Sequence, residues 1–316
     1  MKISLCFPIL FCSLLFNGYA QDNNELSYRF ASRDEARQLI AKEDSYTRGW
    51  SQFDIVSRVQ DPKSTKEKLV AIAAESALEW TAIEKEKIDK AFAFLKENFR
   101  KNQFHLPFPQ EIIMVKTTMR NEAGASAYTR ANWIAIGQYV LDNAKDDYLQ
   151  RLLAHELFHV LTRNNIAFKK KIYSAIGFTV RDQEITFPSD FLEKRISNPD
   201  VSRYDSYAVF TVKGEKKNCI MSMYADREYT SGNFSGYVKI GFIPLDETFT
   251  PIRENGKTVI FNMEDISDFY DQAGRNTSYV IDPEEALADN FSFVIIEMKE
   301  LRSPEITNTI KRMLQE

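Results

Sequence analysis

The segment Leu152–Leu161 constrains most strongly what this chain can fold into. It is apolar except for His155, Glu156 and His159. On a helix, residues four apart lie on one face, so both imidazoles can meet one ion, while Glu156 projects to the side and can reach a water on that ion. Because a helix this apolar is buried, its imidazoles and carboxylate need partners, and a metal supplies them. The pattern therefore favours a zinc site over two core histidines with ordinary hydrogen bonds.

The scarcity of histidine strengthens this interpretation. The chain has only three histidines, and a chance occurrence of two of them in this pattern has a probability below roughly 1%. A metzincin would have Gly and His at positions 162 and 165, where this chain has Thr162 and Asn165. That class is excluded. Since no histidine follows His159, we expect the third zinc ligand to be a carboxylate.

The composition is that of an ordinary globular protein. Hydrophobic residues make up 44% of 316 positions, aromatic residues 13% and charged residues 27%, which excludes disordered and collagen-like classes. Lysine and arginine total 41 against 45 acidic residues, giving a net charge of -4. Because there is no basic excess, we expect no nucleic-acid partner.

The first twenty residues have the pattern of a signal peptide. Lys2 precedes an apolar run from Ile3 to Phe16, and small residues end at Ala20, as in segments that are cleaved on export. We expect a periplasmic or secreted protein. No later stretch reaches the roughly 20 apolar residues of a membrane span, so no transmembrane segment is expected in the mature chain. Cys219 would then be its only cysteine, which we expect to be a small buried side chain.

The pattern of the chain predicts an α+β protein. Residues 21–105 are expected to form an N-terminal helical region, in which Ile88, Phe92, Leu95 and Phe99 make one buried stripe. Whether this region is a removable propiece is left open. Residues 106–316 are expected to form one catalytic domain. Its predicted elements are strands over 111–117 and 128–136, a helix over 146–162, an antiparallel β insertion over 178–263, and helices over 283–301 and 304–314.

A second acidic motif lies near the C-terminus. In Asp282-Pro283-Glu284-Glu285-Ala286-Leu287-Ala288-Asp289 a helical glutamate is followed four residues later by aspartate. Together with the segment around His155, this resembles the gluzincin metallopeptidases. The resemblance covers the two motif helices and, more loosely, the strand before the first. It implies a zincin-like core, with a mixed sheet and the helix of the His-Glu-x-x-His motif. The predicted β insertion lies between the two motif helices and is not explained by the resemblance.

The resemblance also implies roles for the acidic residues. Glu285 would be the third zinc ligand, and Asp289 would orient His155 through its other ring nitrogen. Two alternatives remain open. Glu285 follows Asp282 by three residues, so it could be a capping-box acid, and Glu284 could be the ligand instead.

The implied activity is hydrolysis of peptide bonds by an exported zinc metallopeptidase, expected to be an endopeptidase. One zinc ion per chain would activate a water, with Glu156 as general base, and the substrate would be a protein or peptide. Ala127 and Tyr128 are expected on a strand that binds the substrate main chain. Tyr279, or Tyr207, would stabilise the oxyanion. The alternative is a catalytically silent binding or assembly protein with a structural zinc.

Overall fold

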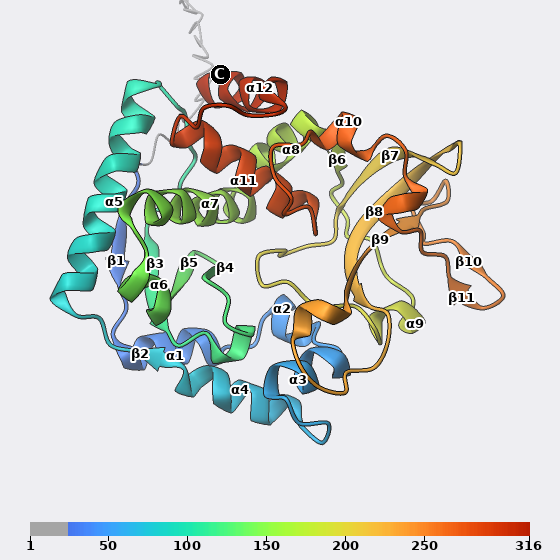
Figure 1. The fold of residues 1–316 in the computed structure, drawn as a ribbon, viewed down its shortest axis with the longest axis horizontal. Coiled ribbons are helices and arrows are strands. Elements are labelled where there is room, and N and C mark those ends of the chain that lie inside the picture. Colours follow the sequence, from blue (N-terminus) through green and yellow to red (C-terminus); the bar gives the residue numbers. More distant parts are fainter. Residues whose placement is uncertain (1–24) are drawn as a thin grey trace, which may run out of the picture.

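The helix that carries the two histidines lies at the centre of the molecule. The computed structural model describes residues 25–316, so the predicted signal peptide at 1–20 lies outside the described residues. Helix α7 (Asp146–Asn164) extends two residues beyond the predicted 146–162 and packs against a mixed sheet (Figure 1). Within residues 25–316, no helix has the length and apolar character needed to cross a membrane.

The first sheet has five strands. Its main order is β1-β3-β5-β4, with β2 also paired to β3. The β1–β3 and β3–β5 pairs are parallel, whereas β4 is antiparallel to β5 and forms an edge. The strands are β1 (Tyr28–Phe30), β2 (Ala77–Leu78), β3 (Ile112–Thr117), β4 (Ala127–Arg130) and β5 (Trp133–Gly137).

The β4–β5 hairpin corrects the prediction of a single strand over 128–136. Arg130 pairs with Trp133 across a two-residue turn, and Ala131 at that turn has a φ of 47°. The turn contains no glycine or proline, so the β-rich pattern continues through it. The reversal makes β4 an antiparallel edge strand beside α7.

Alternate residues of the central strands face two different helical layers, as the period of a strand requires. Ile112 and Met114 of β3 pack with residues of α5 (Ala82–Lys101) and α7. Ile113 and Val115 pack on the opposite side with residues of α1 (Arg33–Ala41) and α4 (Lys66–Glu75). Both faces of the sheet are therefore covered.

The N-terminal region is integrated into this core and is not purely helical. Its further helices are α2 (Ser45–Arg48) and α3 (Gln52–Val59), but β1 and β2 both pair with β3. One hydrophobic cluster contains residues from Leu26 to Leu314. Residues on both sides of the expected boundary at 105/106 therefore share one hydrophobic cluster.

A four-stranded antiparallel sheet lies within the predicted β insertion at 178–263. Its order is β6-β7-β8-β9, and the short hairpin β10–β11 follows (Figure 1). The strands are β6 (Phe178–Val180), β7 (Ser206–Val212), β8 (Glu215–Ala225), β9 (Val238–Pro244), β10 (Arg253–Glu254) and β11 (Lys257–Thr258). Cys219 on β8 is fully buried, as predicted, and burial raises the pKa of its thiol to about 12.

The C-terminal motif helix, α11 (Pro283–Ile295), packs directly along α7. It is shorter than the predicted 283–301 because Ile296 leaves helical geometry and Glu297 adopts a φ of 53°. Every residue of α11 is buried. The other helices are α6 (Gln138–Asn143), α8 (Ile166–Tyr173), α9 (Ser189–Leu192), α10 (Phe269–Ala273) and α12 (Pro304–Gln315).

A buried ion pair joins α5 to the first sheet. The Glu84 carboxylate accepts hydrogen bonds from the Thr81 amide and the Lys116 ammonium, each at 2.8 Å. Burial raises the pKa of Glu84, but these donors outweigh it and hold the pKa at about 2.

We predict that Glu84→Gln lowers the free energy of unfolding at neutral pH by about 3 kcal/mol, because Lys116 loses its buried counter-charge. The folded pKa of Glu84 lies below the ordinary value of about 4.3. Its contribution is therefore complete above that pH and disappears as the pH falls toward 2. Urea unfolding at pH 7, 5, 4 and 3 should show the difference from wild type narrowing with acid.

The matched control is Glu97→Gln on the same helix, where the carboxylate pairs with Arg100 at the surface. That change should alter stability by less than about 0.5 kcal/mol. A stability difference for Glu84→Gln that stays constant with pH would contradict the assigned role.

Candidate metal centre

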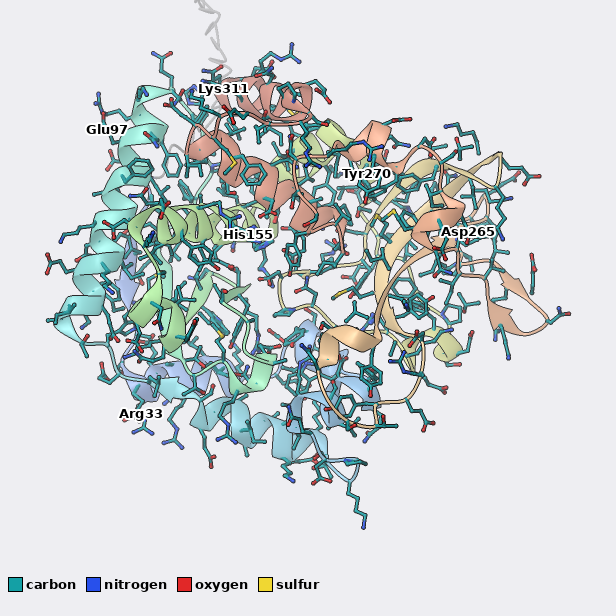
Figure 2. The ribbon with its side chains drawn as sticks, viewed as in Figure 1. Arg33, Glu97, His155, Asp265, Tyr270 and Lys311 are labelled. Atoms are coloured by element: carbon teal, nitrogen blue, oxygen red, sulfur yellow. The ribbon has the colours of Figure 1, made fainter. Side chains whose placement is uncertain are left out.

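Helices α7 and α11 bring the three predicted ligands together. The Nε2 atom of His155 lies 3.1 Å from Oε2 of Glu285, and Nε2 of His159 lies 3.6 Å from the same oxygen. One donor atom from each residue can be chosen so that all three lie within 4.8 Å of one another. Figure 2 shows His155 near the middle of the molecule, where α7 faces the β-rich half.

The other ring nitrogens are held by carboxylates of α11. Nδ1 of His155 lies 3.0 Å from Oδ1 of Asp289, as predicted for Asp289. Nδ1 of His159 lies 3.0 Å from Oε1 of Glu284. Such contacts fix the tautomer of an imidazole and leave its Nε2 lone pair for a metal.

Glu284 and Glu285, either of which could be the ligand on sequence grounds, have different partners in the structure. Glu284 accepts hydrogen bonds from the hydroxyls of Thr162 and Tyr173 as well as contacting Nδ1 of His159. It therefore lies behind His159 and away from Nε2. The Glu285 carboxylate contacts both histidines and Asn198 rather than capping the helix. This arrangement argues against the capping-box alternative for Glu285 and against Glu284 as the ligand.

A buried atom without a hydrogen-bond partner supports the fit of a metal. Among the described residues, Nε2 of His159 is buried and makes no hydrogen bond, although such atoms are normally satisfied. It faces the Glu285 carboxylate. Two imidazole nitrogens and one carboxylate oxygen are a usual donor set for zinc, so the residues fit that ion.

The charged groups of the site shift one another's pKa values. Burial lowers the pKa of His155, but Asp289 and Glu285 outweigh it and raise the pKa to about 9. Burial acts in the same way on His159, but the charges of Asp200 and Glu285 hold its pKa well above the ordinary value. Burial raises the pKa of Glu285, and the two imidazoles more than reverse this. The acids thus favour positive charge between them, whether carried by protons or by a metal.

Glu156 lies on the side of α7 that faces β4. Its Oε2 atom accepts a hydrogen bond from the Thr129 hydroxyl at 2.8 Å. Burial raises the pKa of the Glu156 carboxyl, and the neighbouring imidazoles act in the opposite direction. The base predicted from sequence therefore lies beside both histidines and is held by a strand residue that sequence reasoning missed.

The main chain of β4 makes Ala127 and Thr129 the substrate-binding candidates, in place of the predicted Ala127 and Tyr128. Tyr128 is fully buried and pairs with Ala135 of β5. Hydrogen-bonding groups alternate along an antiparallel strand, so Ala127 and Thr129 direct theirs to the free edge. Tyr128 is therefore not suited to pairing with a substrate through its main chain.

A cavity of about 460 Å³ lies along this edge. It is lined by residues of β4, by Tyr279 and Asp200, by Met223 and Ile240 of the β-rich sheet, and by Phe234 from the turn between β8 and β9. Its walls combine apolar side chains with charged and polar ones, among them Arg58, Glu122 and Asn198.

Tyr279, the residue proposed from sequence to stabilise an oxyanion, lies beside the candidate metal centre. Its ring centroid is 6.2 Å from that of His155, and the charge of Glu285 raises the pKa of its phenol. Tyr207, the other candidate, lies on β7 and packs against Phe249.

The segment Ser197–Asp200, between β6 and β7, also reaches the site. Asn198 Nδ2 donates to Oε1 of Glu285 at 2.5 Å, and Asp200 Oδ1 accepts from the Thr129 amide at 2.6 Å. Neither residue was a candidate from sequence. Ser-Asn-Pro-Asp is an ordinary turn pattern, and nothing in it indicates the distant partners.

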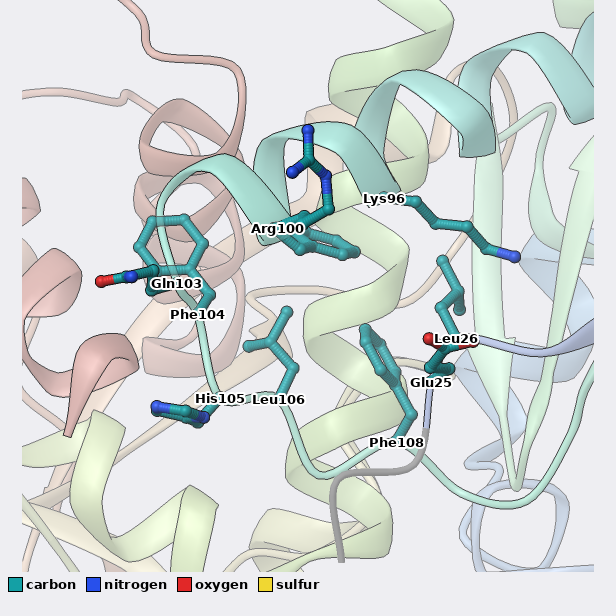
Figure 3. Close-up of a pocket in the computed structure, with 10 residues that line it drawn as sticks. Glu25, Leu26, Lys96, Arg100, Gln103, Phe104, His105, Leu106 and Phe108 are labelled. Atoms are coloured by element: carbon teal, nitrogen blue, oxygen red, sulfur yellow. The ribbon is translucent and has the colours of Figure 1, made fainter.

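The third histidine, His105, lies at another cavity. This cavity of about 480 Å³ is lined by residues 25–26, by α5 and by residues 103–108 (Figure 3). None of its lining residues belongs to α7 or α11. It is therefore separate from the candidate metal centre.

Comparison with known proteins gives one local match. A family model described as an eCIS core domain, for the core of extracellular contractile injection systems, matches residues 114–167. The matched segment contains β4, β5 and α7 but not α11. No curated protein and no solved structure matches the chain.

We predict different effects on metal content for the two adjacent glutamates. Glu285→Ala should abolish stoichiometric zinc binding because it removes a ligand. Glu284→Gln should retain one zinc per chain but weaken its affinity by about 10–100-fold, because His159 loses a carboxylate partner. Elemental analysis after dialysis and competition with a chelator would measure both. Equal zinc loss in the two variants would contradict the assignment.

Proposed function

We propose that the protein is a zinc-dependent peptidase with a zincin-like core of the gluzincin type. His155, His159 and Glu285 would hold one zinc ion. The observation that carries the proposal is the meeting of these donors with Glu156 beside β4, the edge strand of the first sheet. When bound, zinc acidifies a water and polarises a peptide carbonyl.

The protein's own residues have distinct tasks in this proposal. Glu156 takes a proton from the attacking water and delivers it to the leaving amine. The Thr129 hydroxyl holds one oxygen of Glu156, which leaves the other for the water. Tyr279 keeps its proton at neutral pH and can donate a hydrogen bond to the oxyanion.

The substrate is proposed to be an extended protein or peptide segment. Ala127 and Thr129 offer main-chain groups for strand pairing, and the adjoining cavity offers space for side chains. We propose that the protein cleaves its substrate within the chain rather than at an end. The signal-peptide pattern at 1–20 supports an exported protein that acts in the periplasm or outside the cell.

A second function is supported by the match to the eCIS core domain. In this proposal the chain is a binding or assembly protein whose zinc is structural. The position of Glu156 favours the peptidase, because a structural zinc site has no need of a buried carboxylate held beside its ligands.

We predict that Glu156→Gln retains about one zinc per chain but lowers cleavage of an unfolded protein such as reduced casein by at least about 100-fold, because the base is lost. Glu215→Gln, at an exposed glutamate on β8, is the matched control and should cleave like wild type. The peptidase proposal fails if Glu156→Gln cleaves at the wild-type rate.

Thr129→Val should lower kcat about tenfold, because Glu156 loses a hydrogen bond worth about 1.4 kcal/mol. The edge amide and carbonyl remain, so KM and zinc content should change little. Thr129→Ser restores the hydroxyl and should recover most of the rate. A change confined to KM, or no recovery in the serine variant, would indicate that Thr129 does not position the base.

A further inference from the structure

The edge of β4 that has no neighbouring strand is occupied by other parts of the same chain. We call residues 197–200 the strap. The Thr129 amide donates to Asp200 Oδ1 at 2.6 Å. Arg163 Nη2 donates to the carbonyls of Thr129, Pro199 and Asp200 at 2.9 to 3.1 Å. Both outward main-chain groups of Thr129 are therefore bound where a substrate would pair.

The strap also reaches the reacting groups. The Asp200 carboxylate offers an oxygen that lies within 4.8 Å of donor atoms of Glu156 and His159. Asn198 holds the Glu285 oxygen that does not contact the histidines. An attacking water must lie between Glu156 and the metal, which is the region that the Asp200 carboxylate borders.

Contacts outside the metal centre fix one end of the strap. The Ser197 amide donates to Asp54 at 3.1 Å, and Arg58 donates to the Ser197 carbonyl at 2.9 Å. Asp54 and Arg58 form a buried ion pair on α3. The Ser197 hydroxyl donates to the Gly49 carbonyl at 3.0 Å. The strap is therefore held independently of any metal.

We propose that the strap is an internal inhibitor, in which Asp200 binds the metal at its fourth position and keeps the peptidase latent until the strap leaves β4. This inference rests on the proposed function. Carboxylates are ordinary zinc ligands, and four protein ligands close the position that hydrolysis needs. Because the carboxylate belongs to the same chain, it competes at a high effective concentration.

The test reports on the metal directly. The full-length mature protein is loaded with Co²⁺, and its visible absorption spectrum is recorded during titration with acetohydroxamate, a small ligand that needs an open metal position. Asp200→Ala should bind acetohydroxamate at least tenfold more tightly than wild type, and its zinc form should cleave reduced casein at least tenfold faster. Asp182→Ala, at an exposed aspartate after β6, is the matched control and should behave like wild type.

Two further variants test the proposal if the Asp200→Ala protein does not fold. Asp200→Asn keeps the shape but loses the charge, so it should also open the metal position. Asp200→Glu keeps a carboxylate and should remain closer to wild type. Circular dichroism and thermal unfolding would establish that each variant is folded.

The outcomes separate the two proposals. Equal acetohydroxamate affinity in wild type, Asp200→Ala and Asp200→Asn overturns the strap, and cleavage by wild type would then still support the peptidase. If the Asp200 variants bind acetohydroxamate more tightly but no form cleaves casein, the result supports the inhibitory role of the strap and overturns the proposed peptidase activity. Failure of folded wild type to bind Zn²⁺ or Co²⁺ overturns both.

Discussion

The contact between the acids of α11 and the imidazoles of α7 is the interaction on which the rest of the structure depends. Two imidazoles and three carboxylates meet where little water can solvate them. Isolated buried charges would oppose folding. Mutual pairing removes that cost and fixes the rotation of both helices, because Asp289 and Glu284 each hold one Nδ1 atom. Both Nε2 atoms then face the Glu285 carboxylate.

This pairing joins residues that the sequence alone indicated as neighbours. An apolar helix limits where His155 and His159 can point, and the four-residue spacing from Glu285 to Asp289 is a local property of one helix. The predicted α+β class and the position of the β-rich region were likewise set by local patterns. The choice between Glu284 and Glu285 was not local. It depended on which carboxylate Thr162 and Tyr173 bind, and their approach is set by tertiary packing.

Long-range pairing also accounts for what the sequence could not predict. The turn at Ala131 lacks glycine, so the chain reversal that makes β4 an edge strand was hidden in a continuous β pattern. That reversal places Thr129 over Glu156 and directs its amide outward. Asn198 and Asp200 reach the site only because the β insertion returns across α7, and no local pattern in their turn encodes that path.

The N-terminal region bears on how the proposed peptidase would be kept inactive. A removable propiece must leave an intact core when it is lost. Here β1 and β2 belong to the central sheet, α5 packs on α7, and α3 anchors Ser197. Removing residues 25–105 would therefore take two strands from the sheet, uncover the face that α1 and α4 cover, and remove the contacts that hold Ser197. Inhibition that can be relieved without unfolding has to come from a contact that can break while the core stays packed. The contact of the Asp200 side chain with the edge of β4 is of that kind, because Ser197 is held separately by α3.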